Sequence, residues 1–170
     1  MSERADVRVG CFLPVANADA TILILGSMPG QASLKQQQYY AHPHNAFWKI
    51  MGELTGAHPV LPYAQRLAIL KSCSIALWDV LASCEREGSL DADIRAEAAN
   101  DFATFFTRHP HIGRVCFNGS KAEQSFRKFV LGKQVLPQLE FQRLPSTSPA
   151  HAGMSYADKL SAWRAAINQR

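Results

Sequence analysis

The segment from Ala20 to Gly30, ATILILGSMPG, decides the fold class of this chain. Its first part, residues 20–25, is a short apolar run that contains β-branched side chains, and Gly26 and Pro29 then interrupt it. An apolar run of this length, bounded by turn residues, is typical of a fully buried strand that ends in a loop. We therefore expect a buried strand over 20–25, followed by a loop in which the functional region begins.

Further strands and helices alternate along the rest of the chain. Short apolar runs predict strands over 74–78, 114–117 and 141–144. Helical spacing of apolar residues, together with cap residues and prolines, predicts helices over 46–54, 62–70, 100–109, 121–130 and 156–167. Asn45, either Asn100 or Asp101, and Ser155 are placed to cap three of these helices. The polar, charge-rich stretch 83–97 is predicted to contain an irregular excursion.

Strands that alternate with helices at this spacing pair in parallel through right-handed crossovers. The predicted fold class is therefore α/β, a three-layer α/β/α sandwich around a four-stranded, mostly parallel sheet. In such sheets a ligand binds beyond the carboxyl ends of the strands. The most unusual residues of the chain lie at those ends: Gly26 to Gly30, Asp79, Asn118 to Gly119, and Pro145 to Ala152.

Length and composition indicate one folded domain over residues 1–170, with 47% hydrophobic and 19% charged residues. The formal charge of +4 suits a partner that carries phosphates, although many basic proteins bind no nucleic acid. The start, MSERADVRVG, lacks the apolar run of a signal peptide, and no later run is long enough to span a bilayer, so a cytoplasmic protein is expected. Cys11, Cys73, Cys84 and Cys116 show no paired spacing and are expected to be reduced.

Two sequence blocks carry a specific resemblance. GSMPG at 26–30 continues to YYAHPHNAFWK at 39–49, and LPSTSPAHAG follows at 144–153. Together with LWDVLASCEREGSLDADIR at 77–95 and FNGSKAEQSF at 117–126, these blocks resemble the motifs of the uracil-DNA glycosylase superfamily, in the same order. The pattern is most similar to the DNA-deoxyinosine glycosylase family. The resemblance implies a monofunctional enzyme that extrudes a deaminated base, hypoxanthine above all, and hydrolyses its bond to the sugar without metal or cofactor.

One departure from the superfamily pattern bears on the chemistry. Where relatives place an Asn or an Asp in the first motif, this chain has Met28, which cannot activate water. The resemblance implies that Asn45 and Asn118 take over as the polar residues essential to catalysis. An amide can orient water or donate to the leaving base, but it cannot remove a proton. The alternatives are that Asn45 only caps its helix and that Asn118 only forms a turn with Gly119.

The base itself is expected to meet residues of the same motifs. Tyr40 occupies the position where relatives stack an aromatic ring on the extruded base, although one of Tyr39 and Tyr40 is expected in the core. Asp79 stands where uracil enzymes read their base, and its carboxylate suits the N1–H of hypoxanthine, unless it merely caps a turn. The other base-binding residues predicted are Ser27, Met28 and Trp78.

The same loops are expected to contact the DNA backbone through hydroxyl and backbone N–H groups. The residues predicted for this role are Gly26, Pro29, Gly30, Ser33, His42, Ser146, Thr147, Ser148 and His151. Pro149, His151 or Met154 could enter the duplex in place of the lost base. His42 and His44 could in principle bind a metal ion, but no further ligands stand near them in the sequence.

Three other functions compete with this prediction. A glycosylase that acts mainly on uracil or mismatched pyrimidines is disfavoured by Met28, and a non-catalytic DNA-binding relative is disfavoured by the presence of Asn45, Asp79 and Asn118. A serine hydrolase would need a G-x-S-x-G elbow, which the chain lacks. The expected partner is DNA that contains a deaminated base, bound by a monomer.

Overall fold

The computed structural model describes residues 8–86 and 88–168. Its central feature is a parallel sheet with the strand order β3-β2-β6-β7, formed by β2 (Ile22–Gly26), β3 (Ile75–Asp79), β6 (Arg114–Asn118) and β7 (Glu140–Leu144). All three pairings are parallel, and the two central strands are mostly buried because helices cover both faces. The predicted sandwich around a four-stranded sheet is confirmed.

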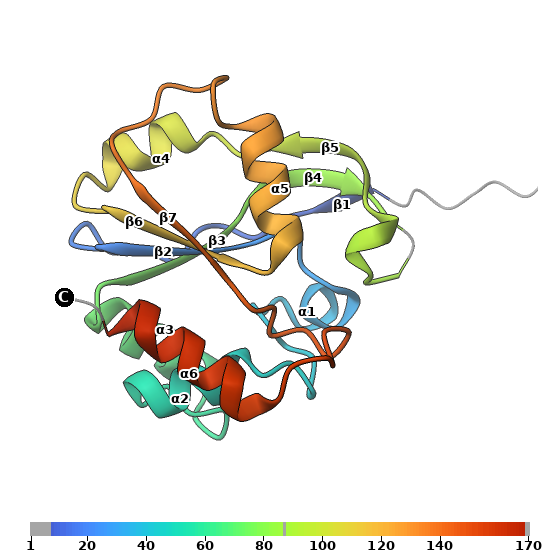
Figure 1. Ribbon diagram of the computed structural model, residues 1–170, viewed down its shortest axis with the longest axis vertical. Coiled ribbons are helices and arrows are strands. Elements are labelled where there is room, and N and C mark those ends of the chain that lie inside the picture. Colours follow the sequence, from blue (N-terminus) through green and yellow to red (C-terminus); the bar gives the residue numbers. More distant parts are fainter. Residues whose placement is uncertain (1–7, 87, 169–170) are drawn as a thin grey trace, which may run out of the picture.

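Helices cover the two faces of the sheet as Figure 1 shows, with α4 (Phe102–Arg108) and α5 (Ser120–Phe129) on one side. The other side carries α2 (Phe47–Thr55), α3 (Tyr63–Ser72) and α6 (Tyr156–Ile167). Alternate residues of β2 point to the two cores: Leu23 and Leu25 pack beneath α4 and α5, whereas Ile22 and Ile24 pack beneath α2 and α6.

The predicted helix caps are confirmed at two of three positions. Asp101 accepts a hydrogen bond from Thr104 N at the start of α4, and Ser155 accepts one from Asp158 N at the start of α6. Asn45 is not the N-cap residue of α2, because the helix begins one residue later than expected and Ala46 holds that position. Asn45 Oδ1 still accepts a hydrogen bond from Phe47 N at 3.0 Å, so the side chain supports the helix start from one residue further out.

The stretch 83–97 contains the predicted irregular excursion, between residues 85 and 95, but its two ends are strands that the sequence did not predict. β4 (Leu81–Glu85) and β5 (Arg95–Ala99) are antiparallel strands, and β1 (Arg8–Gly10) pairs with β4 to complete a second, three-stranded sheet. A short 3₁₀ turn, η1 (Asp91–Asp93), lies between β4 and β5. Register shifts along the β4–β5 pairing break the apolar alternation by which a strand is recognised in a sequence.

A short helix, α1 (Gln31–Gln36), follows β2 and was also not expected from the sequence. Most residues of α1 are polar, so the sequence shows no apolar stripe from which this helix could be predicted. Residues 1–7, on which the prediction about the chain start partly rests, lie outside the described residues. Among the residues that are described, no helix is both long and apolar enough to cross a membrane. The four cysteines are free thiols, of which Cys84 and Cys116 are buried.

Phe126 on α5 tests the core between the sheet and this helix. Its fully buried ring contacts the rings of Phe102, Phe117 and Phe141. Phe126→Ala is expected to lower the free energy of unfolding by about 3–5 kcal/mol, because it removes an aromatic side chain and leaves a cavity. Urea titration would measure the loss. Val60→Ala, at a position 91% exposed, should change the same quantity by less than about 0.5 kcal/mol.

Candidate active site

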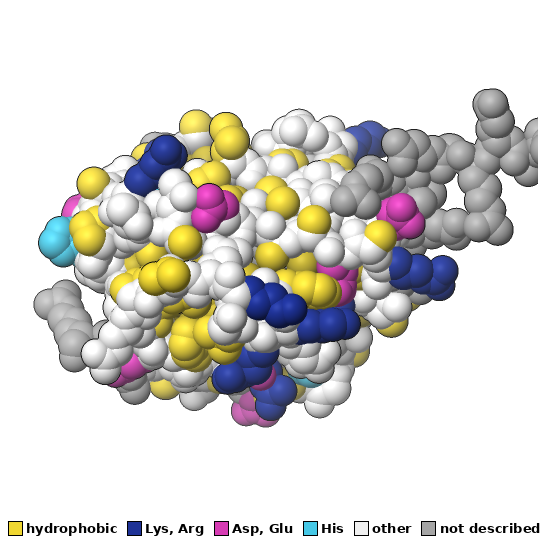
Figure 2. All heavy atoms as spheres, turned by 90° about the horizontal axis from the view of Figure 1, so that it is seen from above, with side chains coloured by type: hydrophobic (Ala, Val, Ile, Leu, Met, Phe, Trp, Pro, Cys, Tyr) yellow, Lys and Arg dark blue, Asp and Glu magenta, His cyan; other side chains and the backbone are white. Residues whose placement is uncertain are grey.

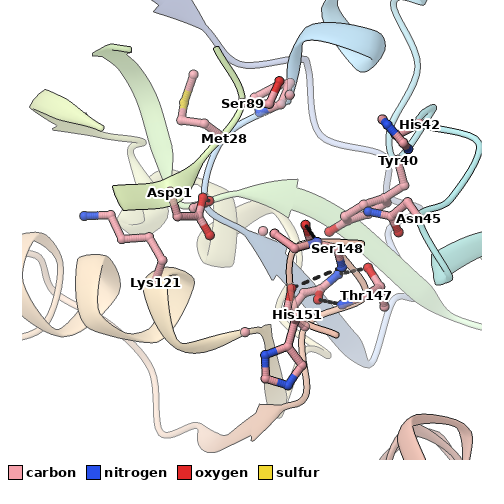
Figure 3. A pocket seen from close by; sticks show the side chains of 18 of the residues that line it. Met28, Tyr40, His42, Asn45, Ser89, Asp91, Lys121, Thr147, Ser148 and His151 are labelled. Carbon is pink, nitrogen blue, oxygen red and sulfur yellow. Dashed lines mark hydrogen bonds between the residues drawn. The ribbon is translucent and has the colours of Figure 1, made fainter. Parts of the chain in front are cut away.

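A deep pocket lies at the carboxyl edge of the parallel sheet, where a ligand site was expected. This carboxyl-edge pocket has a volume of about 840 Å³. It is walled by the glycine–proline loop (residues 26–30), the segment from Tyr39 to Asn45, the ends of β3 and β6, and the serine loop (residues 145–152). Figure 3 shows side chains from these separate segments around one opening. The parallel register explains the convergence, because it aligns Gly26 with Asp79 and Asn118 with Leu144.

The glycine–proline loop is held in place by the turn between β4 and β5. Ser27 Oγ donates to Asp91 Oδ1 at 2.7 Å, and the Arg86 guanidinium donates to the carbonyl of Pro29. Beyond the loop, Gln31 N donates to Ser89 Oγ at 2.8 Å. These contacts place Asp91 and Ser89 at the pocket wall (Figure 3), a role that their irregular sequence context did not reveal.

The two neighbouring tyrosines separate as the sequence predicted, one into the core and one toward the pocket. Tyr39 is 4% exposed, donates its hydroxyl to the carbonyl of Leu13, and accepts from Trp48 Nε1 at its own carbonyl. Tyr40 has a positive φ of 56°, a conformation that few non-glycine residues adopt, and this turns its side chain the other way. The Tyr40 ring stacks on Phe47 with centroids 4.0 Å apart, so one face of the ring is already covered.

Asn118 joins the end of β6 to the serine loop through two hydrogen bonds. Its Nδ2 donates to Thr147 Oγ1 and its Oδ1 accepts from Thr147 N, both at 2.9 Å. The carbonyl of Thr147 in turn accepts from Ala46 N at 3.0 Å, beside Asn45. Asn118 is therefore more than a turn residue, because its amide fixes the loop and brings the Asn45 and Asn118 segments together.

The glycine after Asn118 is required by the same packing. Gly119 has a φ of +91°, and a Cβ at this position would lie 3.0 Å from the Cβ of Ser146. On the far side of the loop, Trp163 Nε1 donates to the carbonyl of Pro145 at 3.0 Å. A buried ring of α6 thus anchors the first residue of the serine loop.

Several hydroxyl groups predicted to contact DNA already hold their own loops. Ser33 Oγ accepts from Ala41 N, Ser146 Oγ accepts from Ser148 N, and Ser148 Oγ accepts from Ala150 N, at 3.1–3.2 Å. His42 Nδ1 accepts from His44 N at 3.0 Å. Because a hydroxyl that accepts one hydrogen bond can still donate another, these contacts are compatible with phosphate binding. Their role toward DNA stays a prediction.

Asp79 is the most unusual titratable residue of the pocket, at 3% exposure. Burial raises the pKa of its carboxyl to about 7, with Arg86 opposing the shift and Asp91 adding to it. Its Oδ2 is buried with no hydrogen-bond partner among the described residues. An aspartate that caps a turn would accept backbone N–H groups, so the capping alternative does not fit.

Trp78 does not face the pocket, and the prediction that it contacts the base does not fit its position. Successive residues of a strand point to opposite faces, so Trp78 turns away where Asp79 turns toward the opening. Its ring packs on Phe102 and Phe105 of α4, and its Nε1 donates to the carbonyl of Phe12.

The other residues predicted for the site lie together at this pocket. They are Gly26, Ser27, Met28, Pro29, Gly30, Ser33, Tyr40, His42, Asn45, Asp79, Asn118, Ser146, Thr147, Ser148 and His151. Within the described residues, no group of three His, Cys, Asp or Glu side chains is arranged to hold a metal ion.

Comparison with known proteins identifies the family. A family model described as the uracil DNA glycosylase superfamily matches residues 13–170. The chain belongs to this superfamily. A protein of Methanosarcina acetivorans named hypoxanthine DNA glycosylase is 37% identical over 155 residues, which cover 91% of this chain and 94% of that protein. One of Methanosarcina barkeri with the same name is 41% identical over 112 residues, covering 65% of this chain and 71% of that protein.

A solved structure supports the same assignment. A solution NMR structure from Methanosarcina acetivorans, described only as a candidate uracil DNA glycosylase, has a TM-score of 0.77 and 36% sequence identity. The match covers 94% of this chain and 96% of that one. The resemblance drawn from the motifs is therefore confirmed, for the fold and for membership of the superfamily.

The first motif of this chain carries Met28 at the position where the resemblance predicted an Asn or an Asp in relatives. The Met28 side chain is 8% exposed and packs with the core beneath α4 and α5, at the pocket wall. A thioether has no acidic or basic group, so the polar chemistry of this pocket rests on its other lining residues, among them the amides, the hydroxyls, the histidines and the carboxyls of Asp79 and Asp91.

Asp79→Asn should stabilise this glycosylase fold more at about pH 8 than at about pH 5. The pKa of Asp79 is higher in the folded protein than in the unfolded chain, so the cost of the buried charge develops as pH rises toward about 7. The gain from the neutral amide should be larger at the higher pH by roughly 1–3 kcal/mol. Denaturant titrations at both pH values would measure it, with the exposed Asp19→Asn as control; an equal effect at both would contradict the prediction.

Proposed function

We propose that this protein is a monofunctional DNA glycosylase that extrudes a deaminated base, most of all hypoxanthine, and hydrolyses its N-glycosidic bond to leave an abasic site. The observation that carries the proposal is the pocket in which Tyr40, Asn45, Asp79 and Asn118 come together at the carboxyl edge of a superfamily fold. The names of the two Methanosarcina relatives support hypoxanthine as the base. The proposed partner is DNA.

The chemistry requires groups that stabilise a sugar with oxocarbenium character and a purine that leaves with the bonding electrons. Asn45 lies at the pocket wall with its Oδ1 accepting from Phe47 N, and no described residue accepts from its Nδ2 amide. This amide is therefore free to donate to the attacking water or to the leaving base. Fixed donors of this kind lower the barrier because they do not reorganise during the reaction.

Binding of the extruded nucleotide would rest on the surrounding loops. The glycine–proline loop and the serine loop present small residues and backbone N–H groups at the pocket mouth, which lets a phosphate backbone come close. Figure 2 shows Lys and Arg side chains in groups on one face of the molecule, with a few acidic side chains among them. Such a surface supplies general attraction to DNA without sequence preference.

The direct test is cleavage of duplexes that each contain one inosine, uracil, xanthine or ethenoadenine, followed by alkali to break abasic sites. Inosine duplex is expected to give abasic sites with no added metal or cofactor, and without strand cleavage before alkali. Uracil duplex is expected to react more slowly, because Met28 offers no polar group to water. Faster release of uracil than of hypoxanthine would favour the uracil-specific alternative and overturn the proposed base preference.

Asn45→Ala is expected to lower the single-turnover rate on inosine DNA by roughly 10²–10³-fold while leaving DNA affinity nearly unchanged. The same substitution removes the hydrogen bond to Phe47 N and should cost about 1 kcal/mol of stability. Thermal melts and single-turnover rates on the same samples separate the two effects, and Asn17→Ala, at an exposed asparagine outside the pocket, is the control. A lowered melting temperature with an unchanged rate would leave Asn45 as a support for the helix and shift the principal catalytic role to Asn118.

A further inference from the structure

Two buried polar atoms without a partner face the carboxyl-edge pocket. Five buried side-chain nitrogen or oxygen atoms of the described residues have no hydrogen-bond partner, and they belong to Tyr40, Asp79, Arg86, Ser125 and Tyr156. Only Tyr40 and Asp79 line the pocket. Burying a polar group without a partner costs free energy, so such atoms are rare unless a ligand or water completes them. Their coincidence at one pocket indicates that a bound molecule supplies the missing partners.

The two groups converge on Gly26. The sheet register pairs Gly26 with Asp79, and an added Cβ on Gly26 would lie 2.6 Å from Asp79 Oδ1 and 3.0 Å from the Tyr40 hydroxyl oxygen. The absence of a side chain at Gly26 therefore leaves room for both groups side by side. Stacking on Phe47 and the positive φ of Tyr40 fix the direction of the phenol, which reaches into the cavity in Figure 3.

The pair offers one acceptor beside one donor. Above its pKa of about 7, Asp79 is an ionised carboxylate that only accepts hydrogen bonds, and a neutral phenol can donate. Burial and the nearby Asp79 carboxylate raise the pKa of the Tyr40 phenol, with the Asn118 amide opposing, so the phenol keeps its proton. The Asn118 amide is engaged on Thr147 through its oxygen and one N–H, and its second N–H can stabilise the phenol oxygen but does not take up the phenol proton. Tyr40 is thus the donor best placed beside Asp79.

This combination matches a lactam, the pair of N–H and C=O groups that deamination of adenine or cytosine creates and that guanine and thymine also carry. Hypoxanthine presents N1–H as a donor beside O6 as an acceptor, whereas adenine presents N1 as an acceptor beside an amino group as a donor. Asp79 and a phenol hydroxyl complement the first pattern. Against adenine, the carboxylate would face an acceptor, and an unmatched buried polar group is strongly disfavoured.

We propose that the Tyr40 hydroxyl is a specificity-determining donor that, beside Asp79, reads the carbonyl of the extruded base and restricts the substrates to bases with a lactam edge. Tyr40 then acts through its hydroxyl, and the ring face covered by Phe47 serves to hold it in place. The proposal rests on the proposed function, since it takes an extruded base as the ligand of the pocket.

Equilibrium binding to non-cleavable 2′-fluoro nucleotides tests this without requiring catalysis. Three single-stranded oligonucleotides would carry hypoxanthine, adenine or unsubstituted purine, so that no base pair has to open. The wild-type protein should bind hypoxanthine roughly 10-fold or more tightly than unsubstituted purine, which lacks both lactam groups, and more tightly than adenine. Tyr40→Phe should lose roughly 10-fold in affinity for hypoxanthine and leave the affinity for unsubstituted purine unchanged.

Tyr156→Phe is the matched control, because the Tyr156 hydroxyl is also buried without a partner but lies outside the pocket. It should leave all three affinities unchanged. Equal wild-type affinities for hypoxanthine and unsubstituted purine would overturn the proposal without any variant. So would a Tyr40→Phe protein that keeps the full preference, or one that loses affinity for both bases equally, because the ring alone would then account for binding.

Failure of the proposed function has a different signature. If the wild-type protein releases no base from inosine duplex, the proposed activity is wrong, yet the binding preference still decides the role of Tyr40. If the wild-type protein releases hypoxanthine but binds hypoxanthine and unsubstituted purine equally, the proposed activity is supported and the proposal for Tyr40 is wrong.

Discussion

The in-register parallel pairing of β2 with β3 on one side and β6 on the other is the constraint on which the rest of the structure depends. Because these strands run in the same direction and their ends are level, the chain leaves the sheet repeatedly at one edge. Gly26, Asp79 and Asn118 are the residues at which β2, β3 and β6 end. Burial of β2 under helices on both faces makes this register costly to change, since a slip of one residue would exchange the two cores.

On this frame, the active site is assembled by contacts between loops that are far apart in the sequence. Asn118 fixes Thr147, Thr147 fixes Ala46, and Asn45 supports the start of α2. The connection between β4 and β5 of the second sheet fixes the opposite wall of the pocket, because Arg86 and Asp91 hold the glycine–proline loop. The pocket is therefore shaped before any ligand binds, which is what fixed-donor catalysis requires.

The chemistry of the pocket follows from its burial. The low exposure of Asp79 raises its pKa, and the same burial leaves one of its oxygens and the Tyr40 hydroxyl without partners. A site with these properties gives up some stability of the empty protein, and under the proposed function a base with a lactam edge would satisfy both groups. Met28 contributes an apolar part of the wall, beside the asparagine amides and the carboxyl of Asp79.

The sequence by itself determined the fold class, the four central strands, the superfamily and most residues of the pocket, because apolar periodicity and ordered motifs are local properties of the chain. It placed Trp78 in the site wrongly, since the motif names a stretch of chain whereas the pleat of β3 decides which side chain faces the opening. Only the tertiary structure revealed the second sheet, whose register shifts hide its alternation, and the roles of Arg86, Ser89 and Asp91. The orientation of Tyr40 was likewise undecided until Phe47 and a positive φ fixed it, because side-chain direction depends on packing between segments that no local pattern encodes.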